Sequence, residues 1–305
     1  MSKVATIDRR TISSQRPLFR RNDLLQPFLK WAGGKRQLVP EIRKYVPQKF
    51  KLYFEPFVGA GAVLFDLQPR VALINDANKE LMNCYRVIKR DPEGLIASAR
   101  EHRNNKQYFY RLRSLDRNPD FKTLSSLERA ARIIFLNKTC YNGLFRVNSQ
   151  GHFNVPFGNY SNPVIVDEVV IRAVSRYLTE AQVEISNDDF EAAVSGAGRG
   201  DFVYFDPPYD PLSDTSSFTG YNLNNFDRDE QRRLKAVCDD LTRRGCKLLL
   251  SNSATEFIRE LYSDTRRYTI VEVEASRNIN SVATGRGKIS ELLIFNNYDA
   301  GQVKE

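Results

Sequence analysis

Two apolar runs that each end in a turn constrain the fold of this 305-residue chain most strongly. The stretch "KLYFEPFVGAGAVLFDL" (51–67) has the pattern of a strand, a glycine-rich turn and a helix. The next stretch, "RVALINDANKELMNCYRVIK" (70–89), has the pattern of a second strand, ending near Asn75 and Asp76, and a second helix. This alternation predicts an α/β fold built on a largely parallel sheet.

The alternation of strand-like and helical patterns resumes in the second half of the chain. Strand-like runs occur at 182–186, 202–206, 247–251, 268–274 and 291–295, and a helical pattern covers 227–243. Between the two halves lie arginine-rich helical patterns and an alternating apolar pattern around a turn at 148–151. We therefore predict a core made of 27–78 and 167–298, an inserted and mostly helical domain at 79–166, and a basic flexible arm at 1–26.

Charge is distributed unevenly along the chain. The net charge is +9 overall, and counting Lys, Arg, Asp and Glu gives +8 for 79–166 but −7 for 167–305. Such asymmetry favours a face that meets a polyanion, although a solvated basic face gives the same count. No run is apolar enough for a membrane span, and the N-terminus lacks the apolar segment of a secretory signal.

Cysteine and histidine usage argues against a metal site. The four cysteines are scattered without C-x-x-C spacing, and the chain has only two histidines. We expect no metal and free thiols in a reducing compartment.

The glycine turn "EPFVGAG" (55–61) indicates a bound nucleotide-like group. Gly59 and Gly61 allow close approach of a ligand to the backbone, although Leu64 replaces the third glycine of a full dinucleotide fingerprint. Asp76, at the end of the next strand, is placed to accept hydrogen bonds from ribose hydroxyls. The segment "WAGGKR" (31–36) is not a phosphate loop, because Arg36 stands where a Ser or Thr is needed.

The most specific motif is "DPPY" (206–209), which ends the run "FVYF". Two prolines stop the sheet hydrogen bonding and stiffen the turn. Asp206 and the Pro207 carbonyl can each accept one hydrogen of an exocyclic amino group, and Tyr209 offers a face on which a base can stack. The motif therefore predicts a site for the amino group of a planar base.

Together, these motifs resemble the Dam-type DNA adenine methyltransferases. The resemblance runs from about Phe28 to Phe295 and rests on "FLKWAGGK", "EPFVGAG", "LIND", "YNGLFRVN", "GHFNVPFGNY", "DPPY" and "SFTGY", in that order. It implies a Rossmann-like class I methyltransferase core with helices on both faces of the sheet and an inserted DNA-recognition domain. It also implies S-adenosylmethionine as the methyl donor and double-stranded DNA as the substrate.

The resemblance assigns roles to individual positions. The catalytic turn would consist of Asp206, Pro207, Pro208 and Tyr209. The cofactor would be held by Trp31, Lys35, Phe57, Gly59, Gly61, Asp76, Asp189, Phe190 and Asp206. DNA would be contacted by Lys30, Tyr141, Asn142, Leu144, Arg146, Pro156 and Tyr160. Tyr141 would insert into the duplex near the target base, and Arg146 would read a guanine through its two donors.

The expected reaction is methylation of the adenine N6 amino group by base flipping and direct in-line transfer, within GATC. Two alternatives stay open at this point: methylation of the cytosine N4 amino group, and a catalytically silent DNA-binding regulator. The polar stretch 215–226 is either a lid ordered by DNA or a surface loop. We expect a cytoplasmic monomer of a prokaryote or phage, with a cognate restriction endonuclease as a candidate partner.

Overall fold

The computed structural model describes residues 21–31, 33–212, 226–276 and 288–298. Within these ranges the strands form one seven-stranded sheet with the order β3-β2-β1-β4-β5-β7-β6. Their bounds are β1 Tyr53–Glu55, β2 Ala72–Ile74, β3 Val183–Ile185, β4 Phe202–Phe205, β5 Lys247–Ser253, β6 Tyr268–Ser276 and β7 Lys288–Asn296. Every strand run predicted from the sequence corresponds to one of these strands.

The sheet is mostly parallel. Strands β1 to β5 pair in parallel, whereas β7 runs antiparallel between β5 and β6. The carboxyl ends of β1, β2 and β4 therefore meet at one edge of the sheet, which is where open α/β sheets bind their ligands. The predicted Rossmann-like α/β fold is confirmed.

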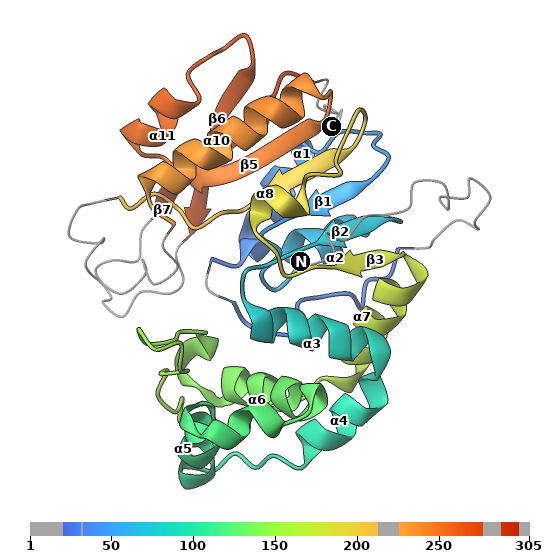
Figure 1. Cartoon of the computed structure of the whole chain (residues 1–305), viewed down its shortest axis with the longest axis vertical. Coiled ribbons are helices and arrows are strands. Elements are labelled where there is room, and N and C mark those ends of the chain that lie inside the picture. The colour runs from blue at the N-terminus through green and yellow to red at the C-terminus, as the bar shows by residue number, and fades with distance from the viewer. Residues whose placement is uncertain (1–20, 32, 213–225, 277–287, 299–305) are drawn as a thin grey trace.

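Helices cover both faces of the sheet, because successive side chains of each strand point to opposite sides. On one face, Tyr53 and Tyr204 belong to an apolar cluster shared with α2 (Ala62–Leu67), α3 (Lys79–Arg90) and α7 (Glu168–Glu180). On the other face, Phe54, Val203 and Phe205 pack with α8 (Phe190–Ala193), α10 (Arg228–Arg243) and α11 (Glu256–Leu261). Figure 1 shows α10 crossing β5 on this second face.

The remaining helices of the described residues lie in the first half of the chain. They are α1 Val39–Lys44, α4 Pro92–Arg100, α5 Lys106–Ser114 and α6 Ser126–Thr139, with short 3-10 turns at Lys35–Gln37, Leu115–Arg117, Pro119–Thr123 and Tyr141–Gly143. The start of α6 is fixed by a capping box, in which the Ser125 side chain accepts from Glu128 N while the Glu128 side chain accepts from Ser125 N.

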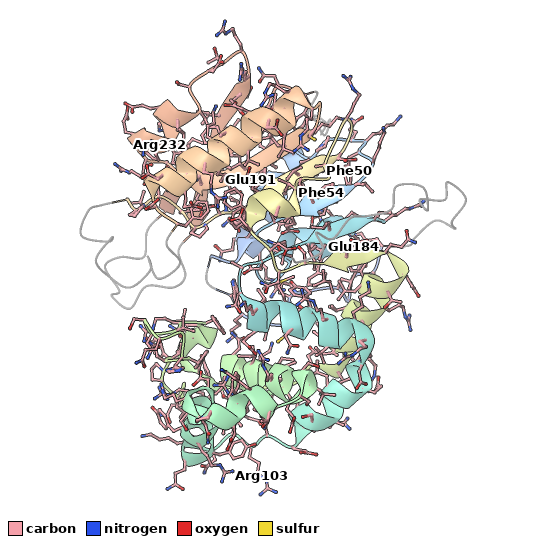
Figure 2. All side chains as sticks on the ribbon, viewed as in Figure 1. Phe50, Phe54, Arg103, Glu184, Glu191 and Arg232 are labelled. Atoms are coloured by element: carbon pink, nitrogen blue, oxygen red, sulfur yellow. The ribbon has the colours of Figure 1, made fainter. Side chains whose placement is uncertain are left out.

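The predicted insertion is continuous with the core at its first helix. Tyr85 of α3 is fully buried and belongs to the same apolar cluster as the sheet residues. Farther from the sheet, Phe109, Phe135 and Phe153 form a separate small cluster. This part makes up the lower half of the view in Figure 1, and Arg103 lies at its far end in Figure 2. The domain boundary at residue 79 stays a prediction, but α3 packs as a core helix.

Part of the predicted flexible arm contacts the core. Leu25 is buried, and Asn22 N donates to Gln68 Oε1 over 2.9 Å. Apolar burial and hydrogen bonds hold residues 22–25 against the end of α2, and the flexible arm at 1–26 stays a prediction. Residues 1–20 and nearly all of the candidate lid at 215–226 lie outside the described residues.

Two further findings concern the protein as a whole. Within the described ranges, no helix combines the length and the apolar character needed to span a bilayer. All four cysteines are buried and none is in a disulfide.

Candidate active site and nucleic-acid interface

The DPPY turn follows β4 at the carboxyl edge of the sheet, and side chains of α10 and β5 hold its backbone by hydrogen bonds. Gln231 Nε2 donates to the Pro208 carbonyl over 2.8 Å, and Ser253 Oγ donates to the Asp210 carbonyl over 2.7 Å. Asn252 Oδ1 accepts from Asp210 N over 3.2 Å. These contacts from α10 and β5 fix the backbone, so the turn presents Asp206 and Tyr209 without needing a ligand to order it.

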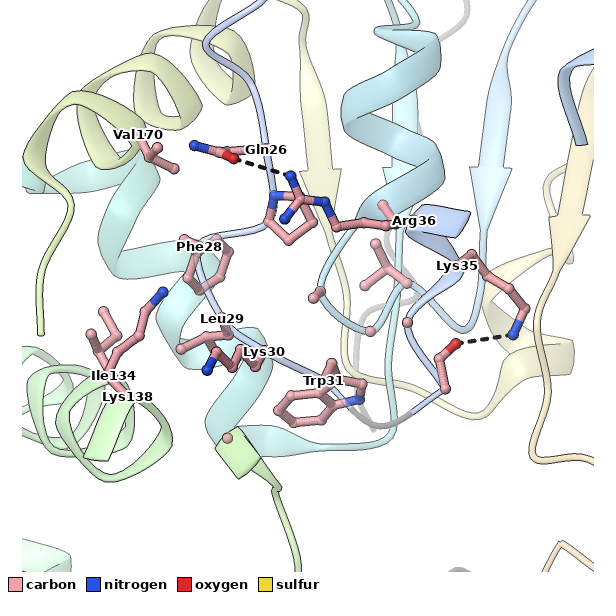
Figure 3. A pocket seen from close by; sticks show the side chains of 18 of the residues that line it. Gln26, Phe28, Leu29, Lys30, Trp31, Lys35, Arg36, Ile134, Lys138 and Val170 are labelled. Carbon is pink, nitrogen blue, oxygen red and sulfur yellow. Dashed lines mark hydrogen bonds between the residues drawn. The ribbon is translucent and has the colours of Figure 1, made fainter. Parts of the chain in front are cut away.

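Lys35 occupies the front of this turn. Its Nζ lies 2.8 Å from Asp206 Oδ1 and donates to the Gly33 carbonyl over 3.0 Å. The same ammonium lies 4.5 Å from the centroid of the Tyr209 ring, which is a cation–π distance. The close-up in Figure 3 shows Lys35 reaching that carbonyl from the same segment that carries Trp31.

The electrostatics of Asp206 reflect its burial. Removal from water raises the pKa of this carboxyl to about 6, against the opposing pull of the Lys35 ammonium. The nearby carboxylates of Glu291 and Asp76 add to the upward shift of the pKa. The group is thus poised to change charge close to neutral pH.

Glu291 is a site residue that sequence reasoning missed. The Tyr209 hydroxyl donates to Glu291 Oε2 over 2.7 Å, which fixes the orientation of the ring. Glu291 pairs in register with Ser253 because β7 runs antiparallel to β5. An acid early in an antiparallel strand therefore lies at the edge where the parallel strands end. Knowledge of that strand direction was the signal needed to find it.

The glycine turn packs closely against neighbouring side chains of the protein. Gly59 has φ +50° and Gly61 has φ +78°, and a Cβ on Gly61 would lie 2.7 Å from the Tyr85 hydroxyl. Asp76 Oδ2 accepts from Gly59 N over 3.1 Å and Asp76 Oδ1 accepts from Asn78 N over 2.9 Å. The structure therefore places Asp76 directly beside the turn, and burial raises the pKa of its carboxyl.

A cavity of about 420 Å³ joins the glycine turn to the catalytic turn. Sites for small molecules and cofactors usually have volumes from about 300 to 1,000 Å³, so this cavity is within that range. Residues of the core and of the predicted insertion line it together, among them Lys30, Trp31, Lys35, Glu55, Gly59, Asn142, Leu144 and Asp206. Figure 3 shows its Trp31 and Lys35 end and its Lys138 end.

Glu55 is another residue at this cavity that the sequence did not single out for chemistry. It is 2% exposed, and the Tyr53 hydroxyl donates to its Oε2 over 2.8 Å. Burial raises the pKa of this carboxyl well above its usual range. The lining of the cavity thus includes a buried carboxyl group.

Phe57 and Phe190 contact each other, whereas Asp189 is engaged elsewhere. The two rings lie 5.4 Å apart, and Phe226 lies 5.7 Å from Phe57. The Asp189 carboxylate caps α8 and pairs with Arg233 Nη2 over 2.7 Å. It is half-exposed on this side of α8, so its assignment to the cofactor stays a prediction.

All the predicted DNA-contacting residues except Lys30 lie on one segment, 141–160, which we call the recognition segment. Tyr141 is 46% exposed, and its backbone N donates to the Pro156 carbonyl over 2.9 Å. Arg146 is exposed, and its Nε donates to Asn154 Oδ1 over 2.8 Å. Lys30 Nζ reaches over the Tyr160 ring at 5.3 Å, which joins the segment to the core. The segment therefore presents an aromatic ring and a guanidinium to solvent.

Comparison with known proteins gives a consistent result. The family described as D12 class N6 adenine-specific DNA methyltransferase matches residues 31–279. Type II methyltransferase M1.LlaDCHI of Lactococcus lactis subsp. cremoris is 47% identical over 274 residues, which are 89% of this chain and 95% of that protein. Type II methyltransferase M.MjaIII of Methanocaldococcus jannaschii is 43% identical, covering 89% and 99%. The DNA adenine methylase of Serratia marcescens is 36% identical, covering 87% and 96%.

Proposed function

We propose a specific reaction for this chain, which belongs to the D12 class N6 adenine-specific DNA methyltransferase family. The protein is a DNA methyltransferase that acts on the N6 amino group of adenine. We infer that it flips the adenine of GATC out of duplex DNA and methylates it there. The observation that carries this proposal is the single cavity shared by Asp206, Gly59 and Asn142, which come from the catalytic turn, the glycine turn and the recognition segment.

Membership in this family implies the use of S-adenosylmethionine, and the residues present fit that group. Gly59 and Gly61 hold left-handed backbone conformations, with φ +50° and +78°, and Asp76 offers carboxylate oxygens beside that turn. We propose that Trp31, Lys35, Phe57, Asp76 and Phe190 hold the cofactor, with Asp189 as the least supported member. When bound, the cofactor supplies an electrophilic methyl group.

The catalytic turn provides acceptors for the adenine amino group. We propose that Asp206 and the Pro207 carbonyl each accept one of the two amino hydrogens, which directs the nitrogen lone pair outward. Tyr209, held by Glu291, supplies the stacking face, and Pro208 keeps the turn stiff. Lys35 now holds Asp206 Oδ1, so it has to yield part of that contact to the incoming base.

The recognition segment supplies the DNA contacts. A flipped adenine leaves a gap whose opening costs a few kcal/mol, and an exposed aromatic side chain such as Tyr141 can fill it. We propose that Asn142, Leu144, Arg146 and Pro156 contact bases and that Lys30 and Tyr160 flank them. The basic charge of 79–166 supports a nonspecific phosphate attraction that weakens with salt.

A restriction-modification role is a further part of the proposal. Two of the relatives are named Type II methyltransferases, and this supports a cognate restriction endonuclease that acts separately on the same site. Other relatives are named DNA adenine methylases without that designation.

The test is expression in a host that lacks adenine methylation. Mass spectrometry of the nucleosides should find N6-methyladenine, and single-molecule sequencing should place it at GATC. N4-methylcytosine in its place would overturn the reaction, and methylation at another sequence would overturn only the GATC assignment.

A further inference from the structure

Asn137, near the end of α6, ties the recognition segment to the segment that carries Trp31. Its Oδ1 accepts from Lys30 N over 2.9 Å, and its Nδ2 donates to the Lys30 carbonyl over 2.7 Å. The same Nδ2 donates to the Gly143 carbonyl over 2.8 Å. The residue is 1% exposed, so one buried amide holds backbone groups from both segments. Neither segment can shift without breaking hydrogen bonds that water does not replace.

Two further contacts reinforce this connection. Gly143 has φ +64°, and a Cβ placed there would lie 2.6 Å from Lys30 Cβ, so the Gly143 backbone lies against the Lys30 side chain. The Trp31 and Phe145 rings stack with centroids 5.0 Å apart. On its other side, Trp31 Cδ1 would lie 3.1 Å from a Cβ on Gly59. A continuous set of contacts therefore runs from the glycine turn to the recognition segment.

We propose that Asn137 and the contact between Gly143 and Lys30 couple DNA recognition to cofactor affinity. The inference rests on the proposed function, because it takes 141–146 as the DNA-reading part and Trp31 as part of the cofactor site. Cognate DNA that orders the recognition segment fixes Lys30 and Trp31 through Asn137, and the cofactor then binds a prepared site. Coupling of this kind is reciprocal, so the cofactor raises the affinity of the protein for cognate DNA by the same factor.

The first variant is Asn137→Asp, which keeps the shape of the side chain but replaces the donating amide with a carboxylate facing two carbonyls. Its matched control is Asn296→Asp. Asn296 is also buried and also holds backbone, since its Oδ1 accepts from Leu248 N over 2.8 Å and its Nδ2 donates to the Cys246 carbonyl over 2.9 Å. It lies on β7 beside β5, away from the recognition segment.

A second pair of variants keeps the proposal testable if Asn137→Asp fails to fold. Gly143→Ala pushes Lys30 away from the recognition segment but also strains a left-handed backbone position. Gly151→Ala carries the same strain, since Gly151 has φ +80°, yet an added Cβ there would have no heavy atom within 4 Å. The difference between the two isolates the contact with Lys30.

The measurement is calorimetric titration of the full chain with sinefungin, a cofactor analogue without a transferable methyl group. The titration is done without DNA, with a duplex that carries the unmethylated recognition sequence, and with a duplex that lacks that sequence. We expect the cognate duplex to lower the dissociation constant of sinefungin about fivefold or more, which is the low end of typical coupling factors. Asn137→Asp and Gly143→Ala should reduce that factor to about one, whereas Asn296→Asp and Gly151→Ala should retain it.

The outcomes separate the two levels of the proposal. If wild-type protein binds both ligands but independently, or if Asn137→Asp and Gly143→Ala keep the full factor, the coupling is refuted and the proposed function stands. If wild-type protein binds neither sinefungin nor the duplex, the proposed function fails and the coupling fails with it.

Discussion

The catalytic turn and the recognition segment are held in place by different means. The catalytic turn follows β4, whose four residues are all buried and which pairs in register with β1 on one side and β5 on the other. The recognition segment has only two isolated bridges among the described residues, Cys140 with Phe157 and Val147 with Phe153. Its position depends on side chains that bond to its backbone and on the burial of Phe153 and Val155 in the cluster with Phe109 and Phe135.

Those side chains come from α5, α6 and the turn after α5. Arg113 Nη1 donates to the Val155 carbonyl over 3.1 Å, and Asp116 Oδ2 accepts from Phe153 N over 2.7 Å. Arg132, which is 2% exposed, pairs with that same Asp116 oxygen over 3.0 Å. A few individual substitutions can therefore move the recognition segment, whereas the catalytic turn is fixed by the core.

The largest effect should come from breaking the buried ion pair behind the recognition segment. Arg132→Met leaves Asp116 buried and unpaired, and we expect it to lower the free energy of unfolding by about 3–5 kcal/mol. Urea denaturation measures the change. Arg172→Met is the control, because Arg172 pairs with Glu93 on the surface, where loss of a pair costs about 0–1 kcal/mol. Equal effects of the two variants would show that the Arg132 pair is not a structural anchor.

The catalytic turn should respond in rate rather than in stability. Asp206→Ala removes one acceptor for the amino group, and we expect single-turnover methylation to fall about 10²–10³-fold. Affinity for the cognate duplex, measured by fluorescence anisotropy, should stay within about twofold, because the proposed role places Asp206 against the flipped base rather than against the duplex. Near-normal turnover in this variant would contradict the assigned role.

Arg146 tests base reading by the recognition segment. Arg146→Ala should cost about 1–3 kcal/mol of discrimination at one guanine, because its guanidinium can pair with two guanine acceptors. The measurement is kcat/KM on duplexes that each carry one substituted base pair. Arg103→Ala, at the far end of the molecule, should leave the ratios unchanged. A uniform loss of affinity across all the duplexes would instead assign Arg146 to phosphate contact.

The smallest expected effect is a pH dependence at the catalytic turn. The Asp206 carboxyl has a pKa of about 6, and only its ionised form accepts through both oxygens. We expect kcat/KM to fall as pH drops through about 6, by roughly tenfold for each unit below. Lys35→Met removes the charge that holds this pKa down, so it should shift the acid limb to higher pH. An acid limb that stays in place would show that another group controls the rate.

Stability should move in the opposite direction over the same range. The folded pKa of Asp206 lies above the ordinary value of about 3.9, so the native state binds more protons than the unfolded state between about pH 4 and 6. This group therefore stabilises the fold below about pH 4, and that contribution is lost as pH rises through 6. Unfolding of wild-type protein and Asp206→Asn, compared at pH 4.5 and about 7, measures the difference.

Much of the fold was predictable from local patterns. The strand at 202–206 and the helix at 227–243 were placed within about two residues, because burial and period are visible in a single segment. The left-handed backbone at Gly61 agrees with the glycine turn that the sequence indicated after the strand. In contrast, the contact of Leu25 with the core was missed, because nothing local distinguishes a docked terminal segment from a free one.

The sequence by itself determined the chemical groups: an acid and two prolines after a buried strand, a glycine turn followed by Asp76, and an arginine and a tyrosine in a basic insertion. Only the tertiary structure decided how these groups meet. Lys35 contacts Asp206 and Glu291 contacts Tyr209 across long sequence separations, and Asn137 joins Lys30 to Gly143. Such contacts depend on strand order, strand direction and helix packing, which no single segment encodes.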